Sequence, residues 1–331
     1  MHEISLENYN LRTDLIIERE DINGSKKESI VDETYKVERI EDNNEKYISI
    51  SFEDITDKDN FKIIENTLIK ELKLVLKDYN IQKEDLVLII GLGNSLSTPD
   101  SLGPKTLENI LVTSYLYNLG EVDQSYQNTA IFKPEVTGTT GIETSTIIKS
   151  LIEKTNTKLV IFIDALAASS LDHLNKVIQV TTKGISPGSG VGNNREELTR
   201  NTLNIPVIAI GVPTIVEAAT IVKDTLINLK KHISYQIENK DNLKTKLTTY
   251  QDYSEQENTL SKQEEKDILG EIGLLEPLDL KQLIDEVLIP IKYNLMVTPK
   301  EIDFQIEKLS LLIANSLNKS LHDNFNPTKL L

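Results

Sequence analysis

The sequence predicts an α/β fold in three layers, with an open, mostly parallel sheet and helices on both of its faces. Three near-continuous apolar runs, at 86–90, 158–164 and 205–211, have the length of strands that are buried on both sides. Apolar residues at helical spacing separate these runs, and strands that alternate with helices are typical of a parallel sheet. The two patterns favour a single α/β domain over residues 15–331.

The N-terminal region is predicted to add a hairpin to this domain. Residues 1–32 are mostly polar, and we interpret them as a loosely held leader. The runs 35–40 and 47–52 alternate polar and apolar residues around an Asp-Asn-Asn turn, which is typical of a β-hairpin. We therefore assign residues 33–60 to a hairpin region.

Helices are predicted where apolar residues recur every three to four positions. Ile64, Leu68, Leu72 and Val75 share one face of a helix that begins near residue 61. The other expected helices cover 105–117, 141–155, 213–232, 277–289 and 299–322. A further strand at 176–182 is expected near an edge of the sheet.

A polar stretch and a helical tail complete the chain. Residues 238–267 are almost wholly polar, and we predict a mobile insertion there. The segment 277–322 is predicted to be a helical tail. Its amphipathic spacing is explained by packing against the core or against another subunit.

Composition excludes several classes of protein. The chain carries 36 Lys and Arg against 52 Asp and Glu, a formal charge of −16 that repels a phosphate backbone, so we expect no direct binding of nucleic acid. The absence of cysteine excludes disulfides, a thiolate nucleophile and a metal site made of cysteines. No apolar run approaches the roughly 20 residues of a membrane helix, and the first residues lack the pattern of a signal peptide. We expect a cytoplasmic protein that binds no membrane.

The stretch LVLIIGLGNSLSTPDSLGP, residues 86–104, raises the question of what its glycines are for. A dinucleotide-binding fingerprint needs a third glycine, and Leu96 stands at that position. A phosphate-binding P-loop needs Gly-Lys-Ser/Thr, which the sequence does not contain. The glycines therefore serve the turn, and the residue that the loop presents is Asp100. A simpler alternative is that Asp100 caps a helix or forms an Asx turn.

A second aspartate, Asp164, ends the apolar run 158–164. In open α/β sheets, ligands bind in the crevice beyond the carboxyl ends of the strands. If the two strands are neighbours, Asp100 and Asp164 face one crevice, and two close carboxylates then hold one proton between them. Such a pair can activate a water molecule and protonate a leaving amine.

Six motifs, in this order, resemble the spore germination protease family: GLGNSLSTPDSLGPK, GTTGIETS, IFIDALAASS, ISPGSGVGNNREEL, IPVIAIGVPTIV and NLMVTPKEID. The resemblance covers essentially the whole chain. It implies a homotetramer with a core similar to that of the hydrogenase-maturation endopeptidases, and an atypical aspartic endopeptidase without a cofactor. The two aspartates of the family match Asp100 and Asp164. The implied substrates are the small acid-soluble proteins that coat spore DNA, degraded during germination in the spore core.

The resemblance also implies a zymogen that is made in the forespore and matures by cutting itself. The stretch LRTDLIIE matches the family's processing pattern, an acidic residue followed by an apolar one. This match implies a cut between Asp14 and Leu15 and a propeptide of residues 1–14. The simpler interpretation is a disordered terminus without consequence.

The loop 185–198 is a candidate for binding substrate. Its residues Gly188, Gly190 and Asn193 offer backbone amides that can hold a peptide or a developing oxyanion, although a tight turn would need the same glycines.

Two other functions stay open. We expect no metal, and we predict that His173 is exposed on a helix rather than a ligand. A metal-dependent maturation-type peptidase would lose its activity with a chelator. A non-catalytic binding or assembly protein would tolerate the loss of both aspartates.

Overall fold

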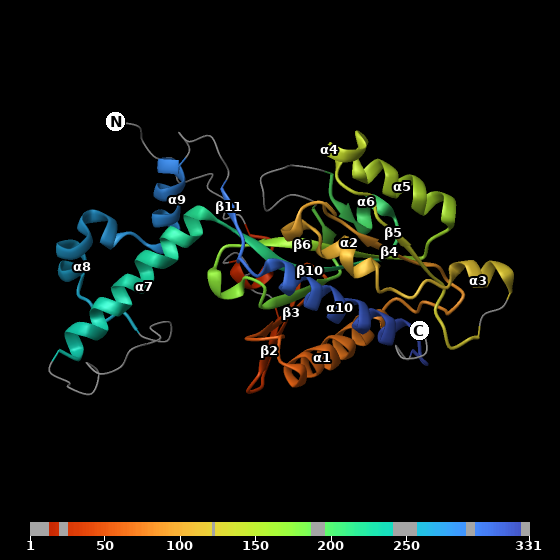
Figure 1. Cartoon of the computed structure of the whole chain (residues 1–331), viewed down its shortest axis with the longest axis horizontal. Helices are drawn as coiled ribbons and strands as arrows, with labels where there is room; N and C mark the ends of the chain where they lie inside the picture. Colours follow the sequence, from red (N-terminus) through yellow and green to blue (C-terminus); the bar gives the residue numbers. More distant parts are fainter. Residues whose placement is uncertain are drawn as a thin grey trace. The chain divides into compact units, whose positions relative to one another are not determined.

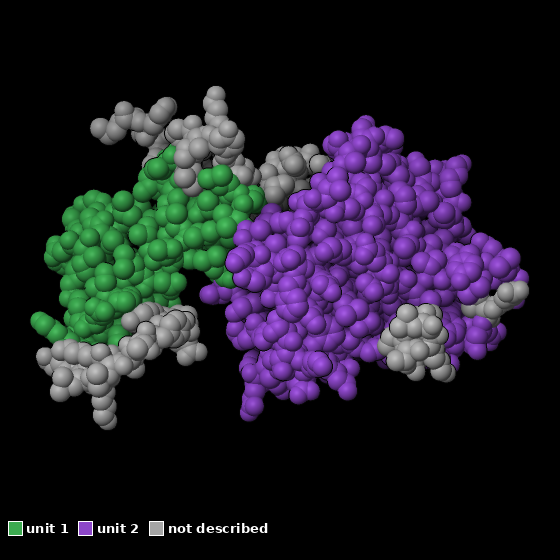
Figure 2. All heavy atoms as spheres, in the orientation of Figure 1, with its two compact units in different colours: residues 1–11, 169–171, 216–297 green, residues 12–168, 172–215, 298–331 purple. Residues whose placement is uncertain are grey.

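Figure 1 shows the computed structural model of the chain. The structure describes residues 13–19, 26–120, 123–186, 196–240, 257–288 and 295–325. Within them the chain forms two compact units (Figure 2). The larger unit is drawn from Arg12–Ala168, Asp172–Ile215 and Thr298–Leu331, and the smaller one from Ser169–Leu171 and Val216–Val297.

The larger unit is built on a mixed sheet. Its strands follow one another across the sheet in the order β1, β2, β3, β7, β10, β6, β4, β5. In that order they span Lys26–Val31, Tyr35–Asp42, Glu45–Phe52, Val177–Thr181, Val207–Glu217, Leu159–Ala168, Val87–Gly91 and Thr129–Phe132. β4 pairs in parallel with β5 and with β6, whereas antiparallel pairs join β1 to β2, β2 to β3 and β3 to β7. The predicted hairpin is confirmed as β2 and β3.

Helices cover both faces of this sheet, so the predicted α/β fold is confirmed (Figure 1). One face carries α1, Lys58–Lys77, together with α2, Leu102–Leu107, and α10, Ile302–Leu321. The opposite face carries α5, Thr144–Thr155. The shorter elements of this unit are α3 Ser114–Leu119, α4 Thr137–Thr140, α6 Arg200–Leu203, β8 Gly184–Ile185 and β9 Leu198–Thr199.

The hydrophobic core follows the periodicity of the sequence. The four predicted face residues of α1 are all buried: Ile64, Leu68, Leu72 and Val75. On β6, Ile161 and Ile163 join the core beneath α1 and α10, whereas Val160 and Phe162 join the core beneath α5. This alternation is that of a strand with both faces covered.

Two predicted elements of the larger unit are wrong. The helix expected at 105–117 is replaced by α2 and α3, because the backbone N–H groups of Leu111 and Thr113 bond to Asn318 Oδ1 and to β5 rather than within a helix. The strand expected near an edge at 176–182 is β7, which lies between β3 and β10. The hairpin pairs with β7 and extends the sheet beyond it.

The prediction of a loosely held leader is wrong for its described residues. β1 pairs along its full length with β2. Residues 13–19 belong to the larger unit and pack within it, and Leu15 and Ile16 are 0% and 2% exposed. Their contacts come from strands far along the chain, which a polar local composition does not reveal.

The smaller unit is mainly helical. It contains α7 Ala218–Glu238, α8 Lys262–Leu269, α9 Pro277–Leu288 and the short strand β11 Met296–Val297. α7 begins later than predicted because β10 continues to Glu217. The carboxylate of Glu217 pairs with buried Lys281 at 2.5 Å. α8 begins within the stretch predicted as an insertion, while residues 241–256 of that stretch lie outside the described residues. None of the described helices combines the length and apolar character needed to cross a bilayer.

Candidate active site

The loop after β4 closes on the backbone of Asp100. Gly93 has a φ of +110°, and a Cβ at this position would lie 2.0 Å from the Asp100 carbonyl oxygen. The N–H of Asn94 donates to the same oxygen at 3.0 Å. Only glycine permits this conformation and this close approach, so the glycine serves the turn, as predicted. Asp100 ends a short 3₁₀ helix, Thr98–Asp100, and is partly exposed.

Helix α2 fixes this loop to the ends of two neighbouring strands. A Cβ on Gly103 would lie 2.4 Å from the carbonyl oxygen of Leu92 and 2.5 Å from that of Ile163. Leu92 N–H itself donates to Ile163 O at 2.8 Å. The 3₁₀ helix that ends in Asp100 consequently contacts β6 as well as α2.

Asp164 directly follows this junction, inside β6 rather than at its end as predicted. β4 stops opposite Ile163, but β6 continues to Ala168. Asp164 is 8% exposed, and its Oδ1 accepts the N–H of Ala165 at 2.9 Å. Both aspartates therefore lie next to the Leu92–Ile163 contact. Asp164 follows Ile163 in the chain, and the backbone of Asp100 contacts Gly93, which follows Leu92. Asp164 is buried and Asp100 is partly exposed, so the two carboxyl groups stand in different environments.

The N-terminal segment 13–19 lies against β6 just beyond Asp164. The N–H of Asp14 donates to Ala167 O at 3.1 Å, and Ala167 N–H donates to Asp14 Oδ2 at 2.9 Å. Ile16 packs with Ile40 and Tyr47, which project from the side of the sheet opposite α1. By the alternation of β6, the side chain of Asp164 projects on that same side.

Gln179 of β7 holds the backbone on both sides of Leu15. Its Nε2 donates to Asp14 O at 2.9 Å, and its Oε1 accepts the N–H of Ile16 at 2.7 Å. Gln179 is 6% exposed. This role could not be read from the sequence, because a polar residue in a strand is ordinary and the partners of Gln179 are more than 160 positions away.

A second polar cluster supports the same segment. The side chain of Glu18 is 4% exposed, and its Oε1 lies 2.7 Å from His173 Nδ1. Its Oε2 accepts the hydroxyl of Thr13, whose Oγ1 in turn accepts Leu15 N–H at 3.1 Å. His173, predicted as an exposed helix residue, therefore contacts a buried carboxylate from a short 3₁₀ helix, Leu171–His173.

Three predicted site residues, Gly188, Gly190 and Asn193, lie outside the described residues. Within the part of the chain that the structure does describe, there is no group of three or more His, Cys, Asp or Glu side chains placed to hold a metal ion.

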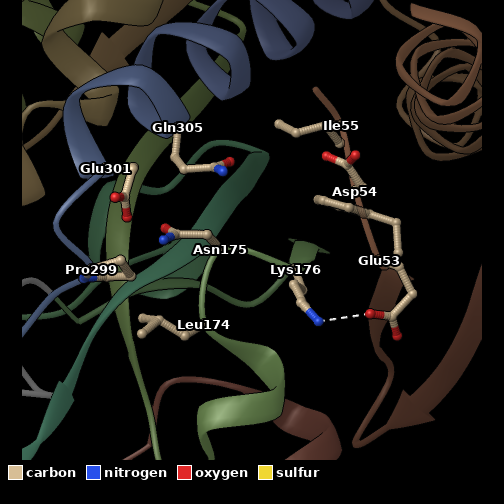
Figure 3. A pocket seen from close by; sticks show the side chains of 10 residues that line it. Glu53, Asp54, Ile55, Leu174, Asn175, Lys176, Pro299, Glu301 and Gln305 are labelled. Atoms are coloured by element: carbon tan, nitrogen blue, oxygen red, sulfur yellow. Dashed lines mark hydrogen bonds and ion pairs between the residues drawn. The ribbon is translucent and has the colours of Figure 1, made fainter. Parts of the chain in front are cut away.

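A small pocket of about 150 Å³ lies elsewhere in the larger unit (Figure 3). It is lined from β3 and its following loop, from residues 174–176 and from the start of α10. Lys176 pairs there with Glu53 at 2.6 Å. Neither Asp100 nor Asp164 lines this pocket, so it is separate from the two-aspartate site.

Comparisons with known proteins agree on one family. Residues 3–330 match the family model described as germination protease. The germination protease of Halalkalibacterium halodurans is 37% identical, over 98% of this chain and 97% of its own. That of Bacillus subtilis is 40% identical, over 93% and 86%, and that of a Geobacillus species 43% identical, over 80% and 73%.

Proposed function

The chain belongs to the germination protease family and is therefore a peptidase of spore germination, and on that premise we propose that Asp100 and Asp164 are its catalytic pair. The observation that carries this proposal is the junction of β4, β6 and α2, which fixes both aspartates beside the Leu92–Ile163 contact. The same backbone contact thus holds the two segments that carry the aspartates.

The chemistry follows from a carboxylate pair that shares one proton. The ionised member takes a proton from a water molecule, whose oxygen attacks the carbonyl carbon of the substrate peptide. The protonated member donates to the carbonyl oxygen as the tetrahedral intermediate forms. When the C–N bond breaks, the leaving nitrogen takes the proton that the first carboxylate removed from water. A hydroxyl proton of the intermediate returns to the other carboxylate as the new carboxyl group forms, so the pair regains its starting state. Asp164 is the more buried of the two, and we assign it the role of the proton donor.

We propose that the substrates are small acid-soluble proteins that bind spore DNA, and that the enzyme starts their degradation in the spore core. The net charge of −16 supports recognition of these proteins rather than of the DNA itself. A homotetramer made in the forespore is the expected assembly.

The enzyme is further proposed to be a zymogen cut between Asp14 and Leu15. The burial of Leu15 and the two bonds of Gln179 support this proposal, because they close the bond against attack until the segment is released. Removal of residues 1–14 would uncover Ala167 in β6, three positions beyond Asp164.

The test is cleavage of a small acid-soluble spore protein by Asp100→Asn and Asp164→Asn, with Asp59→Asn on the exposed surface of α1 as the matched control. We expect each site variant to lose at least about a thousandfold in kcat, in line with the loss of a catalytic acid or base, while its melting curve stays cooperative. The control should keep full activity. Substantial cleavage by a folded site variant contradicts the two-aspartate mechanism, and loss of wild-type activity on chelation favours the metal-dependent alternative.

A further inference from the structure

The backbone nitrogen of Leu15 is linked to a buried carboxylate through one hydroxyl group. Leu15 N–H donates to Thr13 Oγ1 at 3.1 Å, and the Thr13 hydroxyl donates to Glu18 Oε2. The hydroxyl is therefore a bridge between the nitrogen and the carboxylate. On the other side, Glu18 Oε1 lies 2.7 Å from His173 Nδ1.

Residues 15–18 are held by contacts that do not depend on residues 1–14. Ile16 packs with Ile40 and Tyr47, and its N–H donates to Gln179 Oε1. Glu18 keeps its contact with His173. A cut before Leu15 leaves all of these contacts in place, so the new chain end stays close to where Leu15 N lies in the uncut protein.

Hydrolysis of the Asp14–Leu15 bond changes the chemistry of this nitrogen. Water supplies the oxygen for a new carboxylate on Asp14, and Leu15 keeps its nitrogen as an amine. A free α-amine has a pKa near 8 and is therefore mostly a cation at neutral pH. Leu15 is 0% exposed, and a buried cation without a counter-charge is strongly unfavourable. The bridging hydroxyl of Thr13 leaves with residues 1–14.

We infer that Glu18 receives the new α-ammonium of Leu15 after the maturation cut, in the place that the Thr13 hydroxyl occupies before it. This inference rests on the proposed cut between Asp14 and Leu15. Glu18 is thus a positioning residue, which anchors the mature N-terminus on the face of the sheet that carries Asp164. Among the described contacts of Glu18, His173 adds a positive charge to this site when it is protonated.

The anchor has a consequence for the mature enzyme. The cut removes Asp14 from Ala167 and from Gln179 Nε2, so these backbone and amide groups become available beside Asp164. The ion pair keeps residues 15–18 from following the propeptide out of the site. Glu18 therefore separates the part of the leader that must leave from the part that must stay.

The experiment measures the reactivity of the Leu15 amine in protein that has matured from the full chain. Acetylation with acetic anhydride is followed by mass spectrometry of the N-terminal peptide, from pH 6 to 9. The free peptide Leu-Ile-Ile-Glu-Arg-Glu is the unpaired reference, and Glu33→Gln, an exposed glutamate before β2, is the matched control. We expect the wild-type and control amines to react at least about tenfold more slowly than the peptide at pH 7.5, because an ion pair raises the pKa of the amine by one or more.

Glu18→Gln should restore the reactivity of the peptide, and Glu18→Asp should retain part of the protection because the charge remains. If Glu18→Gln does not fold or mature, the wild-type amine compared with the peptide and with Glu18→Asp still decides. A wild-type amine that reacts as fast as the peptide overturns the inference, and so does full protection in Glu18→Gln. If no chain beginning at Leu15 is formed, the proposed cut fails and the inference fails with it. A chain that begins at Leu15 with a reactive amine refutes the anchor alone.

Discussion

His322 gives the sharpest pH-dependent prediction, because its ring is buried in the folded chain and solvated in the unfolded one. It directly follows α10, is 1% exposed, and accepts Gln127 N–H on its Nδ1 at 3.1 Å. Burial, and after it the positive charge of Lys83, lower the pKa of His322 from 6.5 to about 4. The backbone of Leu111 and the charge of Asp323 oppose this change with smaller effects.

The sign of the effect on stability follows from proton binding. Between pH 6.5 and about pH 4 the unfolded chain binds a proton at His322 that the folded chain does not, so the free energy of unfolding falls as the pH falls through this window. Above pH 6.5 His322 is neutral in both the folded and the unfolded chain, so it adds no pH dependence to the free energy of unfolding. A pKa lowered from 6.5 to about 4 corresponds to a loss of roughly 3 kcal/mol in the free energy of unfolding at low pH. We expect about 2 kcal/mol of this loss, because Lys83 and Asp323 remain partly in water and their effects are screened.

The perturbation is His322→Asn, introduced in the Asp100→Asn background so that no maturation occurs during the measurement. Asparagine keeps an oxygen that can accept Gln127 N–H, and it does not titrate. Urea unfolding at pH 7.5 and pH 4.5 should show that the parent loses about 2 kcal/mol more than His322→Asn does. His232→Asn on α7 is the matched control, because it removes another histidine and leaves His322 unchanged.

A direct titration decides whether the reasoning is right. The chain has four histidines, so their ring proton resonances can be followed individually by NMR. The resonance that disappears in His322→Asn should titrate near pH 4. Titration of that resonance between pH 6 and 7 would refute the argument from burial, as would equal losses of stability in the parent and in His322→Asn.

Two further predictions concern the site. Gly93→Ala should abolish most cleavage and destabilise the chain by about 2–4 kcal/mol, because its Cβ would meet the Asp100 carbonyl oxygen at 2.0 Å; Gly120→Ala, also at positive φ but with open space around it, should cost only about 1 kcal/mol and keep activity. Gln179→Ala should speed the maturation cut by about tenfold or more, measured by N-terminal sequencing over time, because it removes two hydrogen bonds worth about 1 kcal/mol each from the closed segment. The exposed α8 variant Gln263→Ala should mature at the wild-type rate, and slower maturation of Gln179→Ala would show that Gln179 aids the cut instead.

The buried parallel strands could be predicted because their sequence and their environment agree. Val160 and Phe162 face one helical layer while Ile161 and Ile163 face the other, so every position of β6 in this stretch is apolar. An apolar run this short fits a strand covered on both faces, because an amphipathic helix keeps one polar side and a wholly buried helix is usually longer. The role of Gly93 in the turn could also be predicted. The stretch matches neither a dinucleotide-binding nor a phosphate-binding motif, so the remaining reason for a glycine there is its backbone conformation.

The leader and the Gln179 contacts could not be predicted, because their causes are not local. Leu15 and Ile16 stand among polar residues, and their burial depends on strands that the chain forms much later. Gln179 is a polar residue within β7, and a polar side chain in a strand is ordinarily expected to face solvent. Its partners are decided by the position of residues 14–16 over the sheet, and no spacing within the sequence records that position.

The burial of residues 15 and 16 explains in physical terms how the uncut chain can stay inactive. Burying Leu15 and Ile16 stabilises the closed segment by about 1.5–3 kcal/mol for each side chain, while ordering each residue costs about 1–2 kcal/mol. Because seven residues of the segment are ordered and only these two are buried hydrophobic residues, burial alone does not hold the segment, and the hydrogen bonds of Asp14, Gln179 and Glu18 help to keep it closed. The bonds that the carboxylates of Asp14 and Glu18 accept are charge-assisted and are the stronger ones of this set. Loss of either carboxylate, as in Asp14→Asn or Glu18→Gln, therefore favours release of the segment and exposure of the Asp14–Leu15 bond, with no change at Asp100 or Asp164.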